Sequence, residues 1–186
     1  MNNRTLLALL LVLFVGPSFI SDASTLQKRD HLTLQEVDLV KEAQALDKRI
    51  EVFIKAAERR LLVINGSSAA NAKQLKKDAE RWGELPAGSR AELVADIAHI
   101  LDEAITNIDD VSSRDERNPL ISKSLRKLAT SVNTIMAQLK PLSAQAKTDA
   151  EVASFELLNE DAQSILEAVG KLPPEVEKKA KKNDKK

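Results

Sequence analysis

Residues 31–66 carry the longest helical pattern in this sequence, and they restrict the possible fold more than any other feature. Apolar side chains recur there at alternating steps of three and four, at positions 39, 43, 46, 50, 53, 57 and 64. This spacing places them on one face of an α-helix. Within these residues, neither glycine nor proline occurs before Gly66. The pattern predicts one continuous helix from Leu34 to Ile64, with a length of roughly 46 Å.

The start and end of this expected helix are both marked in the sequence. Thr33 and Glu36 have the spacing of a capping box, in which each side chain binds the other residue's backbone amide. Asn65-Gly66 suits the left-handed conformation that ends a helix. Charged residues between the apolar positions predict a solvated outer face, formed by Glu42, Asp47, Lys48, Arg49, Glu51 and Lys55. Two basic pairs, Arg59-Arg60 and Lys76-Lys77, are expected on solvated surface as well.

Three later segments repeat the apolar spacing, and each begins with a capping signal. Ser89 and Thr148 each precede a glutamate by three residues, and Asn118 directly precedes a proline at the first helical position. Pro141 should bend or end the second of these helices. The expected helices cover about 90–112, 119–142 and 149–172, and a shorter connecting helix is expected within 69–85.

Four amphipathic helices without strand-like alternation predict an all-α fold. We expect a four-helix bundle, most simply with up-down-up-down topology, that occupies residues 31–172 as a single domain. The heptad-like apolar seams favour shallow crossing angles of the coiled-coil type. The chain contains one tryptophan and four phenylalanines. The core should therefore be aliphatic.

The first 23 residues have the pattern of a secretory signal peptide. Arg4 precedes an apolar run over 5–15, Gly16-Pro17 interrupts it, and small residues at 21 and 23 suit cleavage after Ala23. A retained anchor is the alternative, but the run is shorter than the roughly 20 residues that cross a bilayer. A lipoprotein anchor would need a cysteine, and the chain has none. The protein is therefore expected to be exported, to the periplasm or the medium, without disulfides.

The charge is balanced overall but uneven along the chain. Twenty-eight basic residues match 28 acidic ones, which argues against general nucleic-acid binding. Residues 173–186 are different, because they hold six lysines and three acids and have too few apolar side chains to form a core. We expect this segment to be a disordered tail, which either keeps the protein soluble or makes weak contact with an anionic surface.

The strongest metal-ligand spacing consists of Asp96, His99 and Glu103, which lie at steps of three and four on one helical face. Such a spacing could bring carboxylates and an imidazole to one cation. Di-iron bundles, however, need carboxylates on every helix and a second Glu-x-x-His motif, and the only other histidine is His31. These three residues also flank the apolar positions. They are therefore weak metal candidates, and a solvated polar face is the favoured interpretation.

Other kinds of chemistry have little support in the sequence. Covalent haem attachment needs cysteines, and non-covalent haem between His99 and Met136 is disfavoured because a methionine at helical spacing is usually part of the core. No Gly-x-Ser-x-Gly motif or phosphate-binding glycine loop is present. The acids at 109, 110, 115 and 116 lack the central glycine of a calcium loop. No catalytic residue and no cofactor is predicted.

Trp82 is the one aromatic residue with a possible role in partner binding. It lies in RWGELPAGSR, a segment rich in loop-forming residues. An exposed tryptophan often anchors a partner. A tryptophan that fixes this loop to the end of the bundle is the favoured alternative.

Four segments carry a likeness to other proteins: LQEVDLVKEAQALDKRIEVFIKAAERRL, RWGELPAGSRAEL, ILDEAITNIDD and NPLISKSLRKLA. They resemble a group of exported bacterial all-helical proteins with no assigned activity. The resemblance implies export and a helical fold, and it implies no site residue.

The sequence favours a non-enzymatic protein that acts by contact with another protein or the cell envelope. The alternative is a bundle that holds a metal ion or a small apolar ligand between its helices. Self-association is left open, because heptad seams can pack within one chain or between chains.

Overall fold

The computed structural model describes residues 29–66 and 72–174. Within these residues there are six α-helices and no β-strand, which confirms the all-α prediction. The helices are α1 (Leu34–Glu42), α2 (Leu46–Ile64), α3 (Ala72–Trp82), α4 (Arg90–Arg114), α5 (Pro119–Ser143) and α6 (Asp149–Gly170). The predicted signal peptide and most of the predicted tail lie outside the described residues.

The predicted helix starts are confirmed because capping depends on residues close together in sequence. Thr33 Oγ1 accepts from the Glu36 amide at 3.3 Å, and Glu36 Oε2 accepts from the Thr33 amide at 2.9 Å. The same reciprocal box begins α4 and α6. Asn118 caps α5 through the Leu120 amide, and Pro119 takes the first helical position. Pro141 lies inside α5, in the last turn before the helix ends at Ser143.

The prediction of one continuous helix over 34–64 is wrong. The chain leaves the helix after Glu42 and re-enters it at Leu46, and Ala45 adopts extended backbone dihedrals. Neither glycine nor proline causes this break. Arg49 supports the break, because its Nε donates to the carbonyl of Ala43 at 3.1 Å and so satisfies a group that the helix end leaves free.

A tertiary contact explains why the helix breaks where it does. In a straight helix, residues 24 positions apart would be separated by about 36 Å. The break lets α1 fold back along α2, so that Glu36 accepts hydrogen bonds from Arg60 at 2.8 and 2.9 Å. Helix propensity in this segment is thus outweighed by a buried ionic contact.

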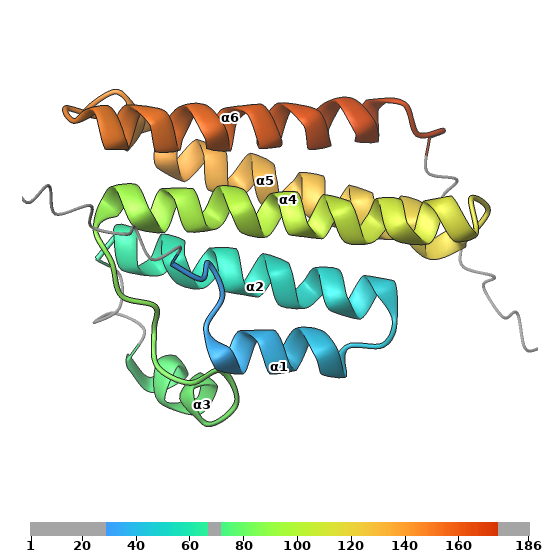
Figure 1. The fold of residues 1–186 in the computed structure, drawn as a ribbon, viewed down its shortest axis with the longest axis horizontal. Helices are drawn as coiled ribbons and strands as arrows, with labels where there is room; N and C mark the ends of the chain where they lie inside the picture. Colours follow the sequence, from blue (N-terminus) through green and yellow to red (C-terminus); the bar gives the residue numbers. More distant parts are fainter. Residues whose placement is uncertain (1–28, 67–71, 175–186) are drawn as a thin grey trace, which may run out of the picture.

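The four long helices α2, α4, α5 and α6 surround one hydrophobic core (Figure 1). The largest interfaces join α4 to α6 and α2 to α4, and α5 completes the ring by packing on α6 and α2. Helix α6 makes no close backbone contact with α2 within the described residues. Helix α6 packs on α4 and α5 instead.

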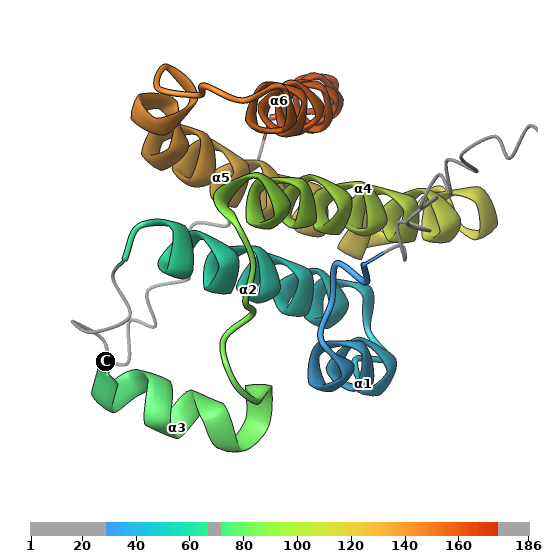
Figure 2. The same ribbon diagram turned by 60° about the vertical axis from the view of Figure 1, so that its left-hand side comes forward.

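The core is aliphatic, as predicted. Its fully buried members include Ile50, Ile97, Ile100, Leu128 and Ile165, and its only buried aromatic residues within the described chain are Phe53 and Phe155. Helices α1 and α3 lie on the side of α2 that faces away from α6 (Figure 2). They contact each other, and α1 also packs on α2.

Polar contacts on the outside of the bundle join neighbouring long helices. Lys123 and Lys127 of α5 pair with Asp47 and Glu51 of α2, each at 2.6 Å. Arg90 of α4 pairs with Glu151 of α6. A search of the helices in the described residues found none with the length and apolar character that a bilayer span requires.

Candidate functional site

A cluster of charged side chains links α1, α2 and α4, and all of its members except Arg29 are buried. We call it the Glu36 cluster, and it consists of Arg29, Glu36, Arg59, Arg60 and Asp96. The Glu36 side chain has no exposed surface, and its carboxylate accepts hydrogen bonds from both Arg59 and Arg60 as well as from the Thr33 amide. A carboxylate buried to this degree is stabilised only when it is fully paired.

Arg59 links α2 to the loop that follows α3. Its Nε donates to Glu36 at 3.2 Å, and its Nη2 donates to the backbone carbonyls of residues 82, 83 and 84 at 2.5 to 3.2 Å. Its guanidinium carbon also lies 5.8 Å from the centroid of the Trp82 ring, within the range of a cation–π contact. Burial lowers the pKa of Arg59, and the Glu36 carboxylate opposes that shift.

Arg60 is the most deeply placed cation, with 1% of its surface exposed. Besides its two bonds to Glu36, it donates to the carbonyl of Ala56 in its own helix and to the carbonyl of His31. Its Nε has no hydrogen-bond partner within the described residues, and Asp96 Oδ2 lies 3.7 Å from it. Arg60 therefore ties the segment before α1 to the middle of the bundle.

Asp96 of α4 closes the cluster on the opposite side. Burial raises its pKa, while the charges of Arg29, Arg60 and His31 act in the opposite direction. Arg29 Nη2 donates to the Asp96 carboxylate at 2.8 Å and to the carbonyl of Ala87 at 2.6 Å. The segment before α1 and the loop before α4 are thus held together by one guanidinium group.

The structure does not bring the three metal candidates together. The carboxylate of Asp96 is occupied by Arg29, His99 is exposed, and Glu103 binds His31 Nε2 at 2.8 Å. The rings of His31 and His99 lie 5.8 Å apart between centroids. Within residues 29–66 and 72–174, no group of three or more suitable side chains could hold a metal ion. The predicted solvated face is wrong for Asp96, which is buried.

Two further predictions of solvated surface are wrong, because the charged residues concerned are buried beside partners of opposite charge. Arg59 and Arg60 were expected on solvated surface, but both are buried against Glu36. Asp47 was assigned to the solvated face of the first helix, but it is buried beside α5, where the hydrogen bond from Lys123 lowers its pKa. Arg49 is half-buried and donates to Asn107 of α4. In contrast, Glu42 and Lys48 are exposed, as predicted.

The sequence contained a signal for the Glu36 cluster. Arg60 lies three residues after Ala57 and four before Ile64, so it occupies the apolar stripe rather than its edge. Asp96 likewise lies three residues after Leu93 and four before Ile100. A charged residue on an apolar stripe requires a buried partner of opposite charge. The partner of Arg60 could not be identified, because it depends on the break between α1 and α2.

Trp82 is half-buried at the end of α3, with its ring beside Arg59. The carbonyls of Trp82 and the next two residues accept from that arginine. Gly83 follows with a φ of +67°, and a Cβ at this position would lie 2.9 Å from the side chain of Gln35. These contacts support the prediction that Trp82 fixes the loop to the bundle.

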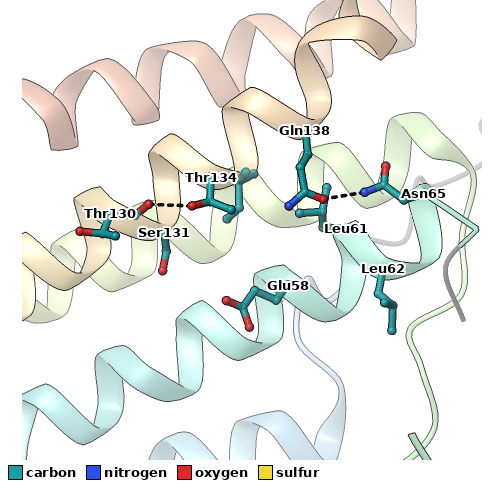
Figure 3. Close-up of a pocket in the computed structure, with 9 residues that line it drawn as sticks. Glu58, Leu61, Leu62, Asn65, Thr130, Ser131, Thr134 and Gln138 are labelled. Carbon is teal, nitrogen blue, oxygen red and sulfur yellow. Dashed lines mark hydrogen bonds between the residues drawn. The ribbon is translucent and has the colours of Figure 1, made fainter. Parts of the chain in front are cut away.

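A groove between α2 and α5 has a volume of about 380 Å³ (Figure 3). We call it the α2–α5 groove. Its apolar surface comes from Leu61, Leu62 and Ile135. Its polar surface comes from Glu58, Asn65, Thr130, Ser131, Thr134 and Gln138. A hydrogen bond of 2.9 Å from Asn65 to Gln138 crosses the groove from one helix to the other.

A second hollow, the α5–α6 cleft, lies on the other side of α5 and has a volume of about 470 Å³. Helix α5 contributes Met136, Ala137, Leu139, Lys140 and Ser143, and α6 contributes Phe155, Leu158 and Asn159. The cleft contains a lysine and no acid, whereas the groove on the other side of α5 contains a glutamate and no base. A third hollow, of about 460 Å³, lies between the α1–α2 break and the end of α3.

Among the described residues, Asp161 of α6 is the one carboxyl group with a large pKa shift. Burial raises its pKa to about 6, and the nearby charges of Asp102 and Glu160 act in the same direction. Its Oδ2 has no hydrogen-bond partner within the described residues. An unpaired carboxylate at the interface of α4 and α6 weakens the fold when it ionises.

Comparisons of this chain with protein-family models, with curated proteins and with solved structures found no match. The resemblance to exported bacterial helical proteins therefore stays a prediction.

Proposed function

We propose that the protein is an exported, non-enzymatic helical bundle that acts by binding another polypeptide. The observation that carries this proposal is the α2–α5 groove, because its Glu58 and Ser131 side chains make no hydrogen bond or ion pair within the described residues, while the side chains of the Glu36 cluster are engaged in holding the fold. As the scaffold we propose an up-down-up-down bundle of α2, α4, α5 and α6. Their shared core supports it.

The groove suits a polypeptide because its walls combine apolar and hydrogen-bonding groups. The side chain of Leu62 offers apolar contact, the Ser131 hydroxyl can donate to and accept from a peptide backbone, and the threonine hydroxyls can accept from it. Figure 3 shows the polar side chains of α5 and Glu58 of α2 on facing walls. Glu58 has no ion-pair partner within the described residues. A partner segment with a lysine or arginine would therefore complement the groove.

Site-specific photo-cross-linking in envelope extracts of the protein's own host tests this proposal. A photoreactive residue at Thr134 should give one discrete cross-linked product of higher mass. The matched control is the same residue at Asn133, which is exposed on α5 but outside the groove. The expected result is a product at position 134 only. Equal labelling at both positions, or none at either, would contradict binding in the groove.

The lysine-rich segment 173–186 is proposed as a second, weaker contact with anionic surfaces. Its net positive charge supports attraction to an anionic membrane of about 1 kcal/mol per lysine near the surface. Co-sedimentation with vesicles that contain anionic lipid should fall when the residues after Pro173 are deleted. Equal sedimentation with and without these residues would refute the contact.

The small-ligand alternative is supported by a different observation, the apolar cleft between α5 and α6. For a metal ion as the ligand, the described residues contain no group of three or more side chains placed to bind it. Metal analysis and an absorption spectrum of protein purified from its own host test the metal form directly. A stoichiometric metal or a chromophore would overturn the proposal of a cofactor-free binding protein.

A further inference from the structure

The α5–α6 cleft combines an apolar floor with a single positive charge. Leu139, Phe155 and Leu158 are buried, and together with the half-buried Met136 they form an apolar surface between the two helices. The volume of about 470 Å³ falls within the roughly 300–1,000 Å³ of typical small-molecule sites. An apolar ligand would therefore remove its own surface and the exposed part of Met136 from water.

Lys140 determines which charge the ligand should carry. It is exposed at the cleft, and its ammonium group has no ion-pair partner within the described residues. The other lysines of α5 differ, because Lys123 and Lys127 are each paired with an acid of α2. No acid lines the cleft. The Asn159 amide adds a group that can donate to an anion.

The same charge argues against the chain's own tail as the occupant. Residues 173–186 have six lysines and three acids, so they and Lys140 repel each other. A ligand with an apolar body and one anionic end satisfies the floor and the lysine together.

We propose that the α5–α6 cleft binds an anionic amphiphile, a molecule with a hydrocarbon chain and a terminal carboxylate. The hydrocarbon chain lies over Leu139, Phe155 and Leu158. The carboxylate pairs with Lys140 at the edge of the cleft. This site is separate from the α2–α5 groove, so each proposal can fail without the other.

Isothermal titration calorimetry of the full purified chain with dodecanoate, below its micelle concentration, tests this proposal. Binding of one dodecanoate per chain is expected. Lys140→Gln should weaken it by about tenfold, as for loss of one charge-assisted hydrogen bond. The matched control is Lys171→Gln, which removes an exposed lysine at the end of α6 and should leave the affinity unchanged.

A second variant and two further probes test the location and the charge preference. Ala137→Phe fills the cleft from an exposed position of α5, so the core is not strained, and it should abolish binding. Dodecanol and dodecyltrimethylammonium should bind at least tenfold more weakly than dodecanoate. Equal binding of the three probes would overturn the role of Lys140, and unchanged binding in Ala137→Phe would overturn the location. If light scattering shows a dimer that Ala137→Phe dissociates, a second copy of the chain occupies the cleft and the proposal is wrong.

Discussion

Two parts of the interior are built from opposite chemistry. In the core shared by the four long helices, aliphatic side chains such as Ile97 and Ile165 are completely buried and need only complementary shape. Where α1 meets α2, Glu36 and two arginines are equally buried, but they need particular atoms at hydrogen-bond distance. The aliphatic part contributes most of the buried side chains. The ionic part specifies one position for α1, since no other register would satisfy these charges.

The largest effect is expected from removal of the central carboxylate. Glu36→Ala leaves two buried guanidinium groups without their counterion and should lower the free energy of unfolding by about 3–5 kcal/mol. Urea denaturation measures this change. Glu42→Ala in the same helix is the control, because Glu42 is exposed, and it should stay within about 0.5 kcal/mol. A loss below 1 kcal/mol for Glu36→Ala would show that the cluster tolerates an unpaired charge.

The next largest difference is expected between conservative substitutions in the Glu36 cluster and in the aliphatic core, measured as the loss in the free energy of unfolding. Arg60→Lys keeps the charge but loses the fork of donors that reaches Glu36 and the His31 carbonyl, and it should cost about 3 kcal/mol. Ile97→Val removes one methyl group from the aliphatic core and should cost about 1 kcal/mol. Urea denaturation of both variants provides the comparison. Equal losses would mean that hydrogen-bond geometry does not distinguish the cluster from the core.

Asp161 differs from Glu36 because no arginine pairs with its carboxyl group, so its ionisation should lower the stability of the fold. Its pKa is about 6 in the fold against an ordinary 3.8. The folded state therefore binds a proton more tightly than the unfolded state between these values, and stability falls as the pH rises through this range. After allowance for solvent screening, Asp161→Asn should raise stability at pH 7 by about 1 kcal/mol.

Urea unfolding curves at pH 4, 5, 6 and 7 give the difference in the free energy of unfolding between the Asp161→Asn variant and the native chain. The difference should shrink as the pH falls, because the native carboxyl group is then protonated. Glu167→Gln, at an exposed position of the same helix, provides the control. A difference of the same size at pH 4 and pH 7 would rule out ionisation as the cause.

The smallest effect is expected outside both regions. Leu34 is 80% exposed at the first position of α1. Leu34→Gln should change the free energy of unfolding by less than about 0.5 kcal/mol. Thermal denaturation monitored by circular dichroism is a sufficient check. A clear loss of stability would show that this side chain is buried in solution, for example by self-association.

Much of the fold could be predicted from local sequence. Capping boxes depend on residues three positions apart, so the starts of α1, α4 and α6 were predicted at the correct residues. The break at Ala43–Ala45 could not be predicted in this way. Its residues favour a helix, and the contact of Glu36 with Arg59 and Arg60 outweighs that preference.

The candidate sites were harder to predict than the helices. Arg60 and Asp96 were predicted on solvated surface although each lies on an apolar stripe, and the residues that meet them come from separate parts of the chain. The two hollows beside α5 depend on how small side chains such as Ala137 and Ser143 meet the neighbouring helices. Helical periodicity indicates which face of a helix is apolar. It does not indicate which part of that face stays uncovered.

The ion pairs that join α5 to α2 give the molecule an uneven response to salt. Lys123 and Lys127 are largely exposed, so their attraction to Asp47 and Glu51 weakens as the screening length shortens to about 3 Å at 1 M salt. The ion pairs of Glu36 with Arg59 and Arg60 are shielded from the solvent and keep their attraction. Concentrated salt should therefore loosen α5, the helix that forms a wall of both hollows, while α1 stays in place.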